Sequence, residues 1–354
     1  MSERARDERR AAPSSSRAPA GGGRAATGGE PIIDERRAAP SSSRAPEGGG
    51  RATTGGGRSR GDRINGVLLL DKPGGMTSNA ALQTVRRLLN AAKAGHTGTL
   101  DPMATGLLPL TFGEATKFSA DLLNADKSYR ATLKLGATTS TGDAEGAVLK
   151  RWNVAVTHAD VAAVLSRFVG TIEQVPPMHS ALKRDGRPLY ELARAGAEVE
   201  RAPRRITVHR LALIEHHGDA VVVDVDCSKG TYVRVLAEDI GRALGCGAHL
   251  SALRRTRAGR LSVGDAVSLT ALQDMAPGER RARLLPEDEL LASLATVRLD
   301  AAHAERFRQG QRLALDAEPR GHRVRVYGGT NELLGTATIS EWGVVEPERL
   351  VTNN

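Results

Sequence analysis

The chain has 354 residues, enough for two domains with a buried core, and carries 50 Lys and Arg against 41 Asp and Glu. Of the formal charge of +9, the first 60 residues hold +5, from 12 arginines and 7 acidic residues. Because the rest of the chain is only mildly basic, it would have to bind RNA through local basic patches and not through its overall charge. With only two cysteines, Cys227 and Cys246, the sequence has no disulfide framework. No apolar run has the length of a membrane span or resembles a signal peptide. A cytoplasmic protein is therefore expected.

The first segment, residues 1–61, contains a tandem duplication. DERRAAPSSSRAPAGGGRAATGG at 7–29 returns almost unchanged at 34–56. A segment so rich in Gly, Ser, Ala, Pro and Arg cannot bury enough apolar surface to offset the entropy of ordering, so a disordered tail is predicted. A weak electrostatic RNA tether is the alternative function for its arginines.

Ordered structure is expected from about Arg63. The sequence INGVLLLDKPGGMTS (64–78) predicts an apolar strand that ends at Lys72, followed by a Pro-Gly-Gly turn. Ser78 is expected to cap a helix that runs to Asn90. The apolar face of this helix is predicted to consist of Leu82, Val85, Leu88 and Leu89.

The next stretch, GHTGTLDPMATG at 95–106, places one carboxylate, Asp101, in a turn. Pro102 biases Asp101 toward extended backbone, and three glycines give the chain freedom on both sides. These glycines are Gly95, Gly98 and Gly106. No second acid or metal ligand lies nearby in the sequence, so the segment predicts either an acid aimed at a ligand or an ordinary surface turn.

The remaining elements mix helices and strands without strict alternation, which predicts an α+β fold with a mixed sheet. Helices are predicted at 114–124, 158–170 and 231–245, a strand at 128–136, and paired strands over 206–228 around a turn at 217–219. The predicted domains are a main α+β domain at 62–276, a linker at 277–293 and a small β-rich domain at 294–351. Strands of the small domain are expected in HRVRVYGG and LLGTATIS.

Positive charge is concentrated in two stretches of this body. The first, 182–205, includes Lys183, Arg184 and Arg187 around a non-regular DGRP turn, with Tyr190 in its middle and a short helix predicted after it. The second, 253–260, contains Arg254, Arg255, Arg257 and Arg260. Each stretch is compatible with a solvated surface or with contacts to RNA phosphates, and the sequence alone leaves both open.

Aromatic residues are rare, yet Tyr129, Tyr190 and Tyr232 all lie beside basic or glycine-containing motifs. Each could stack against an extruded base or be a half-buried core residue. Arg234 lies in the first turn of the predicted helix 231–245, where a cation opposes the helix dipole. A facing carboxylate would compensate, and if that partner is Asp101, the pairing would keep the acid ionised and oriented.

Several motifs that bind cofactors or metals are missing from the sequence. It contains no P-loop, no glycine-rich dinucleotide loop, no HExxH and no Cys/His cluster at zinc spacing. No cofactor and no metal are therefore expected.

The segment GHTGTLDPMATGLLPLTFGEATK (95–117) resembles the catalytic segment of the bacterial tRNA pseudouridine synthases of the TruB type, which modify uridine 55 in the T loop. Four further blocks of the family are matched in order. These are INGVLLLDKPGGMTS, KSYRATLKLG, PPMHSALKRDGRPLYELARAG and CSKGTYVRVLAEDIGRALGCGAHLSALRR. The resemblance covers about residues 63–350 and leaves out the duplicated tail.

This resemblance implies an isomerase that needs no cofactor or metal. The glycosidic bond of a uridine breaks, the uracil turns in the pocket, and C5 rejoins C1′. Asp101 would be the essential carboxylate, acting either covalently or by removing a ribose proton. Tyr129 would stack on the flipped base and help to remove the C5 proton, and Arg234 would be the ion-pair partner of Asp101.

The resemblance also implies roles in substrate binding. His96 would fill the space that the extruded nucleotide leaves in the T loop, Tyr232 and Leu253 would line the base pocket, and Lys72 would support its edge. The segment 177–205 would be an RNA-binding thumb loop, contacting RNA through Lys183, Arg184, Arg187 and Tyr190. The C-terminal segment would be a PUA-like domain that contacts the acceptor arm of tRNA, and no feature requires more than a monomer or any membrane.

Two alternatives remain at this level. The chain could be an RNA-folding helper that binds and remodels tRNA independently of catalysis, although the presence of Asp101, Tyr129 and Arg234 favours an enzyme. It could also belong to the guide-RNA-dependent branch of the same superfamily. The basic insertion at 177–205 argues against that branch, which resembles the core but lacks the insertion.

Overall fold

The computed structural model describes residues 61–180, 182–184, 186–197 and 199–352. The chain divides into two units, Met1–Gly57 and Arg58–Asn354, and everything described below belongs to the second. The predicted disordered tail, apart from Gly61, lies outside the described residues. Within the described part, no helix combines the length and the apolar character that crossing a membrane requires.

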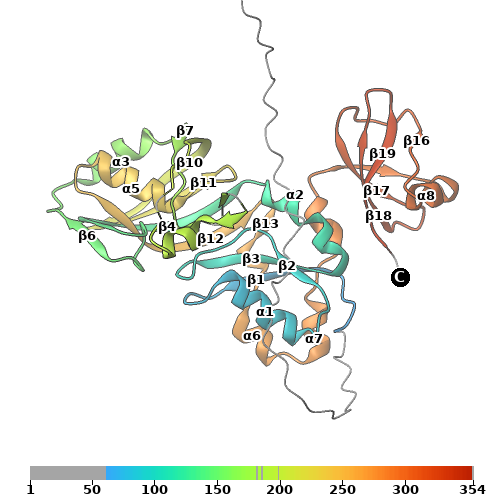
Figure 1. The fold of residues 1–354 in the computed structure, drawn as a ribbon, viewed down its shortest axis with the longest axis horizontal. Helices are drawn as coiled ribbons and strands as arrows, with labels where there is room; N and C mark the ends of the chain where they lie inside the picture. Colours follow the sequence, from blue (N-terminus) through green and yellow to red (C-terminus); the bar gives the residue numbers. More distant parts are fainter. Residues whose placement is uncertain (1–60, 181, 185, 198, 353–354) are drawn as a thin grey trace, which may run out of the picture. The chain divides into compact units, whose positions relative to one another are not determined.

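A ten-stranded sheet with mostly antiparallel pairs forms the larger part of the molecule (Figure 1). Its order is β14-β1-β3-β12-β4-β11-β10-β7, with β2 paired to β3 and β13 paired to β12. Its strands are β1 (Gly66–Lys72), β2 (Ala94–His96), β3 (Thr105–Phe112), β4 (Lys127–Leu135), β7 (Gly170–Gln174), β10 (Arg204–His217), β11 (Ala220–Cys227), β12 (Ala248–Ala258), β13 (Leu261–Ser262) and β14 (Val267–Ser268). Among the described strands of this sheet, β1–β14 and β3–β12 are the pairs that run in parallel, so the predicted mixed α+β core is confirmed.

The two faces of this sheet are covered differently. One face packs against α1 (Ser78–Leu88), α3 (His158–Ser166), α5 (Val233–Ala243) and α6 (Leu269–Asp274) in the main apolar core. On the other face, only the half around β1 and β3 is covered, by η1 (Gly113–Phe118), α2 (Ser119–Leu123) and η3 (Glu287–Leu291). In β11 the pattern is period two, with Val221, Val223 and Val225 buried between less buried neighbours, as expected for a sheet with one covered face.

The strands predicted at 128–136 and 206–228 are confirmed as β4 and the β10–β11 hairpin. The helices are shorter or less regular than predicted. The segment 114–124 divides into η1 and α2, and α3 ends at Ser166 because Gly170, with a φ of +105°, already begins β7. The predicted helix at 231–245 is confirmed as α5, with Arg234 in its first turn.

The predicted cap of the first helix is wrong by one residue. Thr77 is the N-cap of α1, and its hydroxyl accepts a hydrogen bond from the Ala80 amide. Ser78 is instead buried and turned toward the loop that carries Asp101.

The predicted linker, 277–293, is not an irregular connector. It contains α7 (Pro277–Ala282) and η3, and Leu285 exchanges two backbone hydrogen bonds with Val67 of β1. Leu290 and Leu291 are buried in the second apolar cluster. This stretch therefore belongs to the packing of the sheet that precedes it.

The C-terminal part forms a separate five-stranded sheet in the order β15-β17-β18-β19-β16. Its elements are β15 (Ala295–Arg298), α8 (Ala301–Arg308), β16 (Leu313–Ala314), β17 (Arg323–Tyr327), β18 (Leu333–Ile339) and β19 (Val344–Leu350). It has its own apolar core, in which Phe307 of α8 is fully buried. The two predicted strands are confirmed as β17 and β18.

Candidate active site

The loop between β2 and β3, which carries Asp101, is held at its tip by β1, the turn after it and α1. The buried hydroxyl of Ser78 accepts from the Leu100 amide at 2.8 Å and donates to the Leu100 carbonyl at 3.0 Å. On the other side of Asp101, the Pro102 carbonyl accepts from the Gly75 amide and from Lys72 Nζ. Both neighbours of the carboxylate are therefore fixed through their backbones.

Two of the three glycines around this loop are required by its geometry. Gly98 has a φ of +83° and Gly106 a φ of +99°, which side chains rarely allow. A Cβ at Gly106 would lie 2.3 Å from the Arg255 carbonyl oxygen, because β3 and β12 run side by side there. Gly95 lies in β2 without a positive φ, so the freedom predicted for it is not used.

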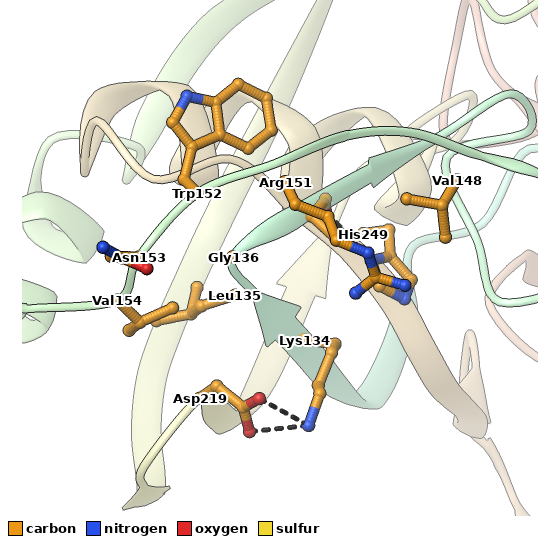
Figure 2. Close-up of a pocket in the computed structure, with 11 residues that line it drawn as sticks. Lys134, Leu135, Gly136, Val148, Arg151, Trp152, Asn153, Val154, Asp219 and His249 are labelled. Carbon is orange, nitrogen blue, oxygen red and sulfur yellow. Dashed lines mark hydrogen bonds and ion pairs between the residues drawn. The ribbon is translucent and has the colours of Figure 1, made fainter.

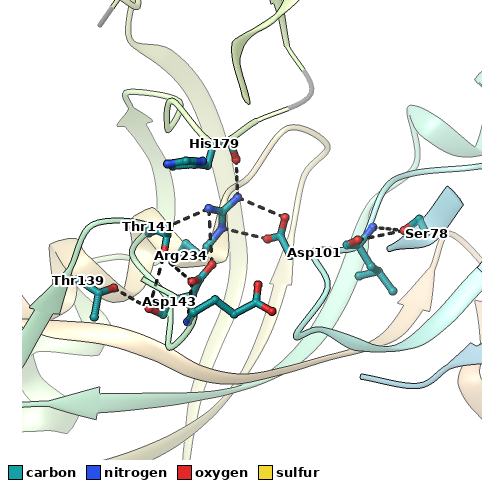
Figure 3. Close-up of polar contacts among 9 residues, drawn as sticks. Ser78, Asp101, Thr139, Thr141, Asp143, His179 and Arg234 are labelled. Atoms are coloured by element: carbon teal, nitrogen blue, oxygen red, sulfur yellow. Dashed lines mark hydrogen bonds and ion pairs between the residues drawn. The ribbon is translucent and has the colours of Figure 1, made fainter. Parts of the chain in front are cut away.

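Arg234 meets Asp101 side-on, although the two residues are 133 positions apart in the chain. Its Nε lies 2.9 Å from Oδ2 of Asp101, and its Nη2 donates to Oδ1 at 3.3 Å. Its remaining bonds go to backbone carbonyls, from Nη1 to Thr141 at 3.0 Å and from Nη2 to His179 at 2.7 Å (Figure 3). The arginine is only 5% exposed, so the predicted ion pair is present and the guanidinium has little room to move.

A second acid, absent from the neighbourhood of Asp101 in the sequence, is supplied by the loop after β5 (Ala137–Thr139). Oδ2 of the buried Asp143 lies 3.7 Å from Nη1 of Arg234. Its other oxygen accepts from the Thr141 hydroxyl and the Glu145 amide. The guanidinium thus lies between two carboxylates (Figure 3), and the Thr-Gly-Asp turn in TTSTGDAEG was the only sequence signal for the second one.

These contacts set the charge of the site. Burial raises the pKa of the Asp101 carboxyl, Arg234 and Lys72 oppose that rise, and Asp143 adds to it. The ion pair therefore limits the rise without reversing it. At the base of the loop, burial lowers the pKa of Lys72 to about 8, opposed by Asp101.

Lys72 is the last residue of β1 and has no exposed surface. Its ammonium donates to the carbonyls of Pro73, Met76 and Pro102 at 2.9, 2.7 and 3.3 Å. Lys72 therefore connects the turn after β1 to the Asp101 loop.

Tyr129, near the start of β4, lies directly opposite Arg255 in the β4–β12 pairing. Burial raises the pKa of the Tyr129 phenol, Arg255 opposes the rise and Asp101 adds a smaller increase, so the ring is neutral at neutral pH. His96 lies in β2, and burial, with a further contribution from Arg255, lowers its pKa. Its Nδ1 atom is buried without a hydrogen-bond partner among the described residues.

Of the four arginines in the basic stretch 253–260, Arg257 and Arg260 are exposed, whereas Arg255 is buried and serves the Asp101 loop. Arg255 is 2% exposed and donates to the Leu107 carbonyl at 2.7 Å and the Gly98 carbonyl at 3.0 Å, so it fixes the far end of the Asp101 loop. Arg254 makes a two-bond pair with Asp71. The signal that could have found this was period two in β12, which places Arg255 on the same face as the buried Leu253.

The two remaining residues predicted to line the base pocket are Tyr232, at the start of α5, and Leu253, in β12. Tyr232 is the N-cap residue of α5, two positions before Arg234, and burial raises the pKa of its phenol. Leu253 is buried in the main core opposite Ala131 of β4, and its carbonyl accepts from the Thr105 hydroxyl at 3.4 Å.

The predicted thumb residues lie in small elements after β7. Lys183 and Arg184 form β8 and pair with β9 (Arg187–Pro188), and Gly186 lies in the turn before β9. The short helix predicted next is α4 (Leu189–Arg194). Arg187 is exposed, and Tyr190 is 37% exposed with its hydroxyl 3.4 Å from Oε1 of Glu191.

A cavity of about 710 Å³ lies elsewhere, between the end of β4, the start of β12 and β6 (Val148–Arg151) (Figure 2). Its lining includes Lys134, Arg151, Trp152 and His249 but none of the predicted site residues. Lys134 is paired with Asp219 at 2.6 Å, and it lies five residues after Tyr129, which places the two side chains on opposite faces of the sheet. The cavity is therefore separate from the Asp101 site.

Within the described residues, no three His, Cys, Asp or Glu side chains are grouped so that they could hold a metal ion. The groups that can act at the site are one carboxylate with two oxygens, a fixed guanidinium and neutral phenols. The Asp101 side chain is 35% exposed, and each of its oxygens keeps a lone pair beyond the bond to Arg234. Such a carboxylate can attack or deprotonate a group brought to it.

Comparison with known families identifies the fold along nearly the whole described chain. Residues 86–233 match the N-terminal domain of the TruB family of pseudouridylate synthases. Residues 234–292 match the tRNA pseudouridylate synthase B C-terminal domain, and residues 295–351 match a further C-terminal domain of TruB pseudouridine synthases.

Curated relatives agree with this assignment. The tRNA pseudouridine synthase B of Dechloromonas aromatica is 57% identical over 289 residues, which cover 82% of this chain and 96% of that protein. The protein of the same name from Burkholderia mallei is 60% identical over 294 residues, covering 81% and 97%.

Two solved structures share the fold at lower identity. A Cbf5-Nop10-Gar1 complex contains a chain with a TM-score of 0.63 and 27% identity, covering 80% of this chain and 84% of that one. An H/ACA ribonucleoprotein bound to a substrate RNA that contains 2′-deoxyuridine gives a TM-score of 0.63 at 26% identity, covering 81% and 85%.

Proposed function

Because the chain belongs to the TruB family of tRNA pseudouridine synthases, we propose that it isomerises uridine 55 in the T loop of tRNA to pseudouridine, with Asp101 as the essential carboxylate. The observation that carries the proposal is the side-on pair of Asp101 with the buried Arg234, on a loop fixed by Lys72 and Ser78. A carboxylate held in this way can meet C1′ or C2′ of an extruded nucleotide in one orientation.

The chain's own residues support the steps that this reaction needs. Asp101 either bonds to C1′ through a carboxylate oxygen or removes the proton from C2′. In both routes the electron pair of the N1–C1′ bond leaves with the uracil, which is then free to turn. Arg234 keeps the carboxylate oriented while its charge changes, since its other bonds to Thr141 and His179 do not depend on Asp101. The neutral ring of Tyr129 provides a flat surface for the base.

In this proposal the other predicted residues serve RNA binding. His96, Tyr232 and Leu253 shape the space for the T loop and the base. The thumb at 177–205 contacts the stem-loop through Lys183, Arg184, Arg187 and Tyr190, and the sheet at 294–351 contacts the acceptor arm. The relatives at 57% and 60% identity are named as tRNA enzymes, whereas the ribonucleoprotein chains are 26% and 27% identical, which favours a tRNA enzyme over a guide-dependent one.

The substitution Asp101→Asn tests the proposal against the RNA-folding helper. On an unmodified tRNA transcript, with pseudouridine mapped by carbodiimide labelling, we expect the wild type to convert uridine 55 and Asp101→Asn to show no detectable conversion. The binding of tRNA should remain within about 3-fold, because the side chain keeps its shape and the site is recognised mainly through the RNA backbone.

The exposed Asp274, at the end of α6, provides the matched control. Asp274→Asn should convert tRNA at the wild-type rate. Conversion that survives Asp101→Asn would contradict the role of the carboxylate. A wild-type enzyme that binds and refolds tRNA but never forms pseudouridine would favour the RNA-folding helper.

A further inference from the structure

The start of α5 carries two site residues and receives little support from its own sequence. Its N-cap residue, Tyr232, makes no side-chain capping bond, and no acidic residue lies in the first turn. Arg234, one residue into the helix, opposes the positive end of the helix dipole. Something outside the helix must therefore hold this end in place.

The side chain of Gln174 provides that support. Its Oε1 accepts from the Tyr232 amide at 3.0 Å, and its Nε2 donates to the Tyr232 carbonyl at 3.3 Å. One carboxamide thus binds both the backbone N–H and the backbone C=O of Tyr232, as a neighbouring β-strand would. Gln174 is 3% exposed and is the last residue of β7, where its backbone pairs with Arg204 of β10.

The chain that follows Gln174 reaches Arg234 itself. Five residues on, the His179 carbonyl accepts from Nη2 of Arg234 at 2.7 Å. The same segment is held from its other side, because Nη1 of Arg201 donates to the Pro176 carbonyl at 3.1 Å. The segment 174–179 thus binds the backbone at the start of α5 and the guanidinium that pairs with Asp101.

We infer that Gln174 is a positioning residue: it fixes the start of α5 and, through it, the placement of Tyr232 and of Arg234 against Asp101. Gln174 has no described contact with Asp101 and acts on the chemistry only through α5. The inference rests on the proposed function, because its consequence is a loss in the rate of conversion. It also ties the base of the thumb loop to the orientation of the essential carboxylate.

Two substitutions at Gln174 and one neighbouring control test the inference. Gln174→Met keeps nearly the length of the side chain and removes both hydrogen bonds. Gln174→Glu keeps the acceptor for the Tyr232 amide and removes the donor. Glu173→Met changes the exposed preceding residue of the same strand, for which no side-chain contact is described.

The measurements are the single-turnover conversion of unmodified tRNA, the Kd for the same tRNA, and the thermal midpoint. We expect Gln174→Met to lower the conversion rate by about 10-fold or more while Kd changes less than about 3-fold, because the reacting group is misplaced and the RNA contacts remain. Gln174→Glu should recover part of the rate. Glu173→Met should match the wild type.

Two further readouts separate positioning from a general loss of stability. Hydrogen exchange of the Tyr232 amide should become faster in Gln174→Met, and less so in Gln174→Glu. The acid limb, which is the pH range over which the conversion rate falls on the acid side, should move to higher pH in Gln174→Met. Arg234 on α5 and Lys72 on β1 lower the pKa of Asp101, and Asp143 on the loop after β5 raises it. Gln174→Met should weaken only the effect of Arg234, because Arg234 is the one of these three residues that α5 carries.

The outcomes distinguish the inference from the function on which it rests. A wild type without conversion would overturn the proposed function. A converting wild type with Gln174→Met at an equal rate and an equal acid limb would overturn the inference alone. A Gln174→Met protein whose rate falls only in proportion to its folded fraction, with an unmoved acid limb, would likewise show that Gln174 is structural and does not position the site.

Discussion

At the scale of single residues, the charges around Asp101 oppose one another. Burial and Asp143 raise the pKa of the carboxyl, whereas Arg234 and Lys72 lower it. If conversion needs the ionised acid, activity is present above the pKa of the folded enzyme and is lost as the pH falls through it. The pH dependence of the rate therefore reports on these neighbours.

Substitutions of the guanidinium and of the acid on its other side should move this acid limb in opposite directions. Arg234→Gln removes the opposing cation, so the limb should move up by about 1 pH unit or more and the rate at neutral pH should fall about 100-fold. Asp143→Asn removes a charge that raises the pKa, so the limb should move down by less, since Arg234 lies between the two acids. Single-turnover rates from pH 5 to 8 would measure both. Shifts of the same sign would contradict this electrostatic account.

The residues that the sequence could identify were those with an unusual local context. Asp101 before a proline and Arg234 at a helix start both conflicted with their surroundings, and the structure joins them. Asp143 lies in an ordinary polar stretch, so only the fold shows that it faces Arg234. For Arg255, the period-two pattern of β12 indicates the buried face, but only the fold shows that Arg255 lies opposite Tyr129. Residue types thus indicated the chemistry of the site, whereas contacts between distant polar side chains required the fold.

At the scale of elements, two adjacent residues at the start of α1 have separate tasks. The Thr77 hydroxyl caps the helix, while Ser78 holds the Asp101 loop through Leu100. Ser78→Ala leaves the buried amide of Leu100 without its partner, which costs about 1–3 kcal/mol and should lower the conversion rate about 10-fold because the loop tip loosens.

Thr77→Ala is the matched control for this prediction. The loss of the cap should lower the free energy of unfolding by about 1 kcal/mol and leave the rate unchanged at a temperature where both variants are folded. Thermal unfolding and single-turnover assays on the two variants would separate stability from activity. An equal loss of rate in both variants would show that α1, and not the Ser78 contact, matters.

Elements with strong periodicity were predictable and those without it were not. The valines of β11 and the apolar stripe of α5 identified their elements. The stretch 277–293 has no such pattern, because α7 has no buried residue and η3 has only the adjacent pair Leu290 and Leu291 among acidic residues. Its contact with Val67 of β1 joins positions more than 200 residues apart, and no local pattern encodes that pairing.

At the scale of the whole molecule, the site gathers residues from Lys72 to Arg255, whereas the duplicated tail lies outside this span. The match with the Dechloromonas aromatica relative covers 96% of that protein but 82% of this chain, which leaves a stretch of about the tail's length unmatched. We therefore expect the proposed reaction to proceed without the tail, whose net charge of +5 would add a salt-dependent attraction to RNA.

Removal of residues 1–60 tests this division of the chain. The shortened enzyme should convert uridine 55 at a rate within about 2-fold of the full chain, with a Kd for tRNA that differs by less than about 3-fold at 150 mM salt, where scattered arginines contribute little. A full-length variant with its 12 tail arginines replaced by serine controls for the length of the tail. If both the shortened chain and the serine variant lose 10-fold or more in affinity, and the difference disappears at high salt, the tail is an electrostatic RNA tether. If only the shortened chain loses activity, the enzyme depends on the tail for something other than its charge.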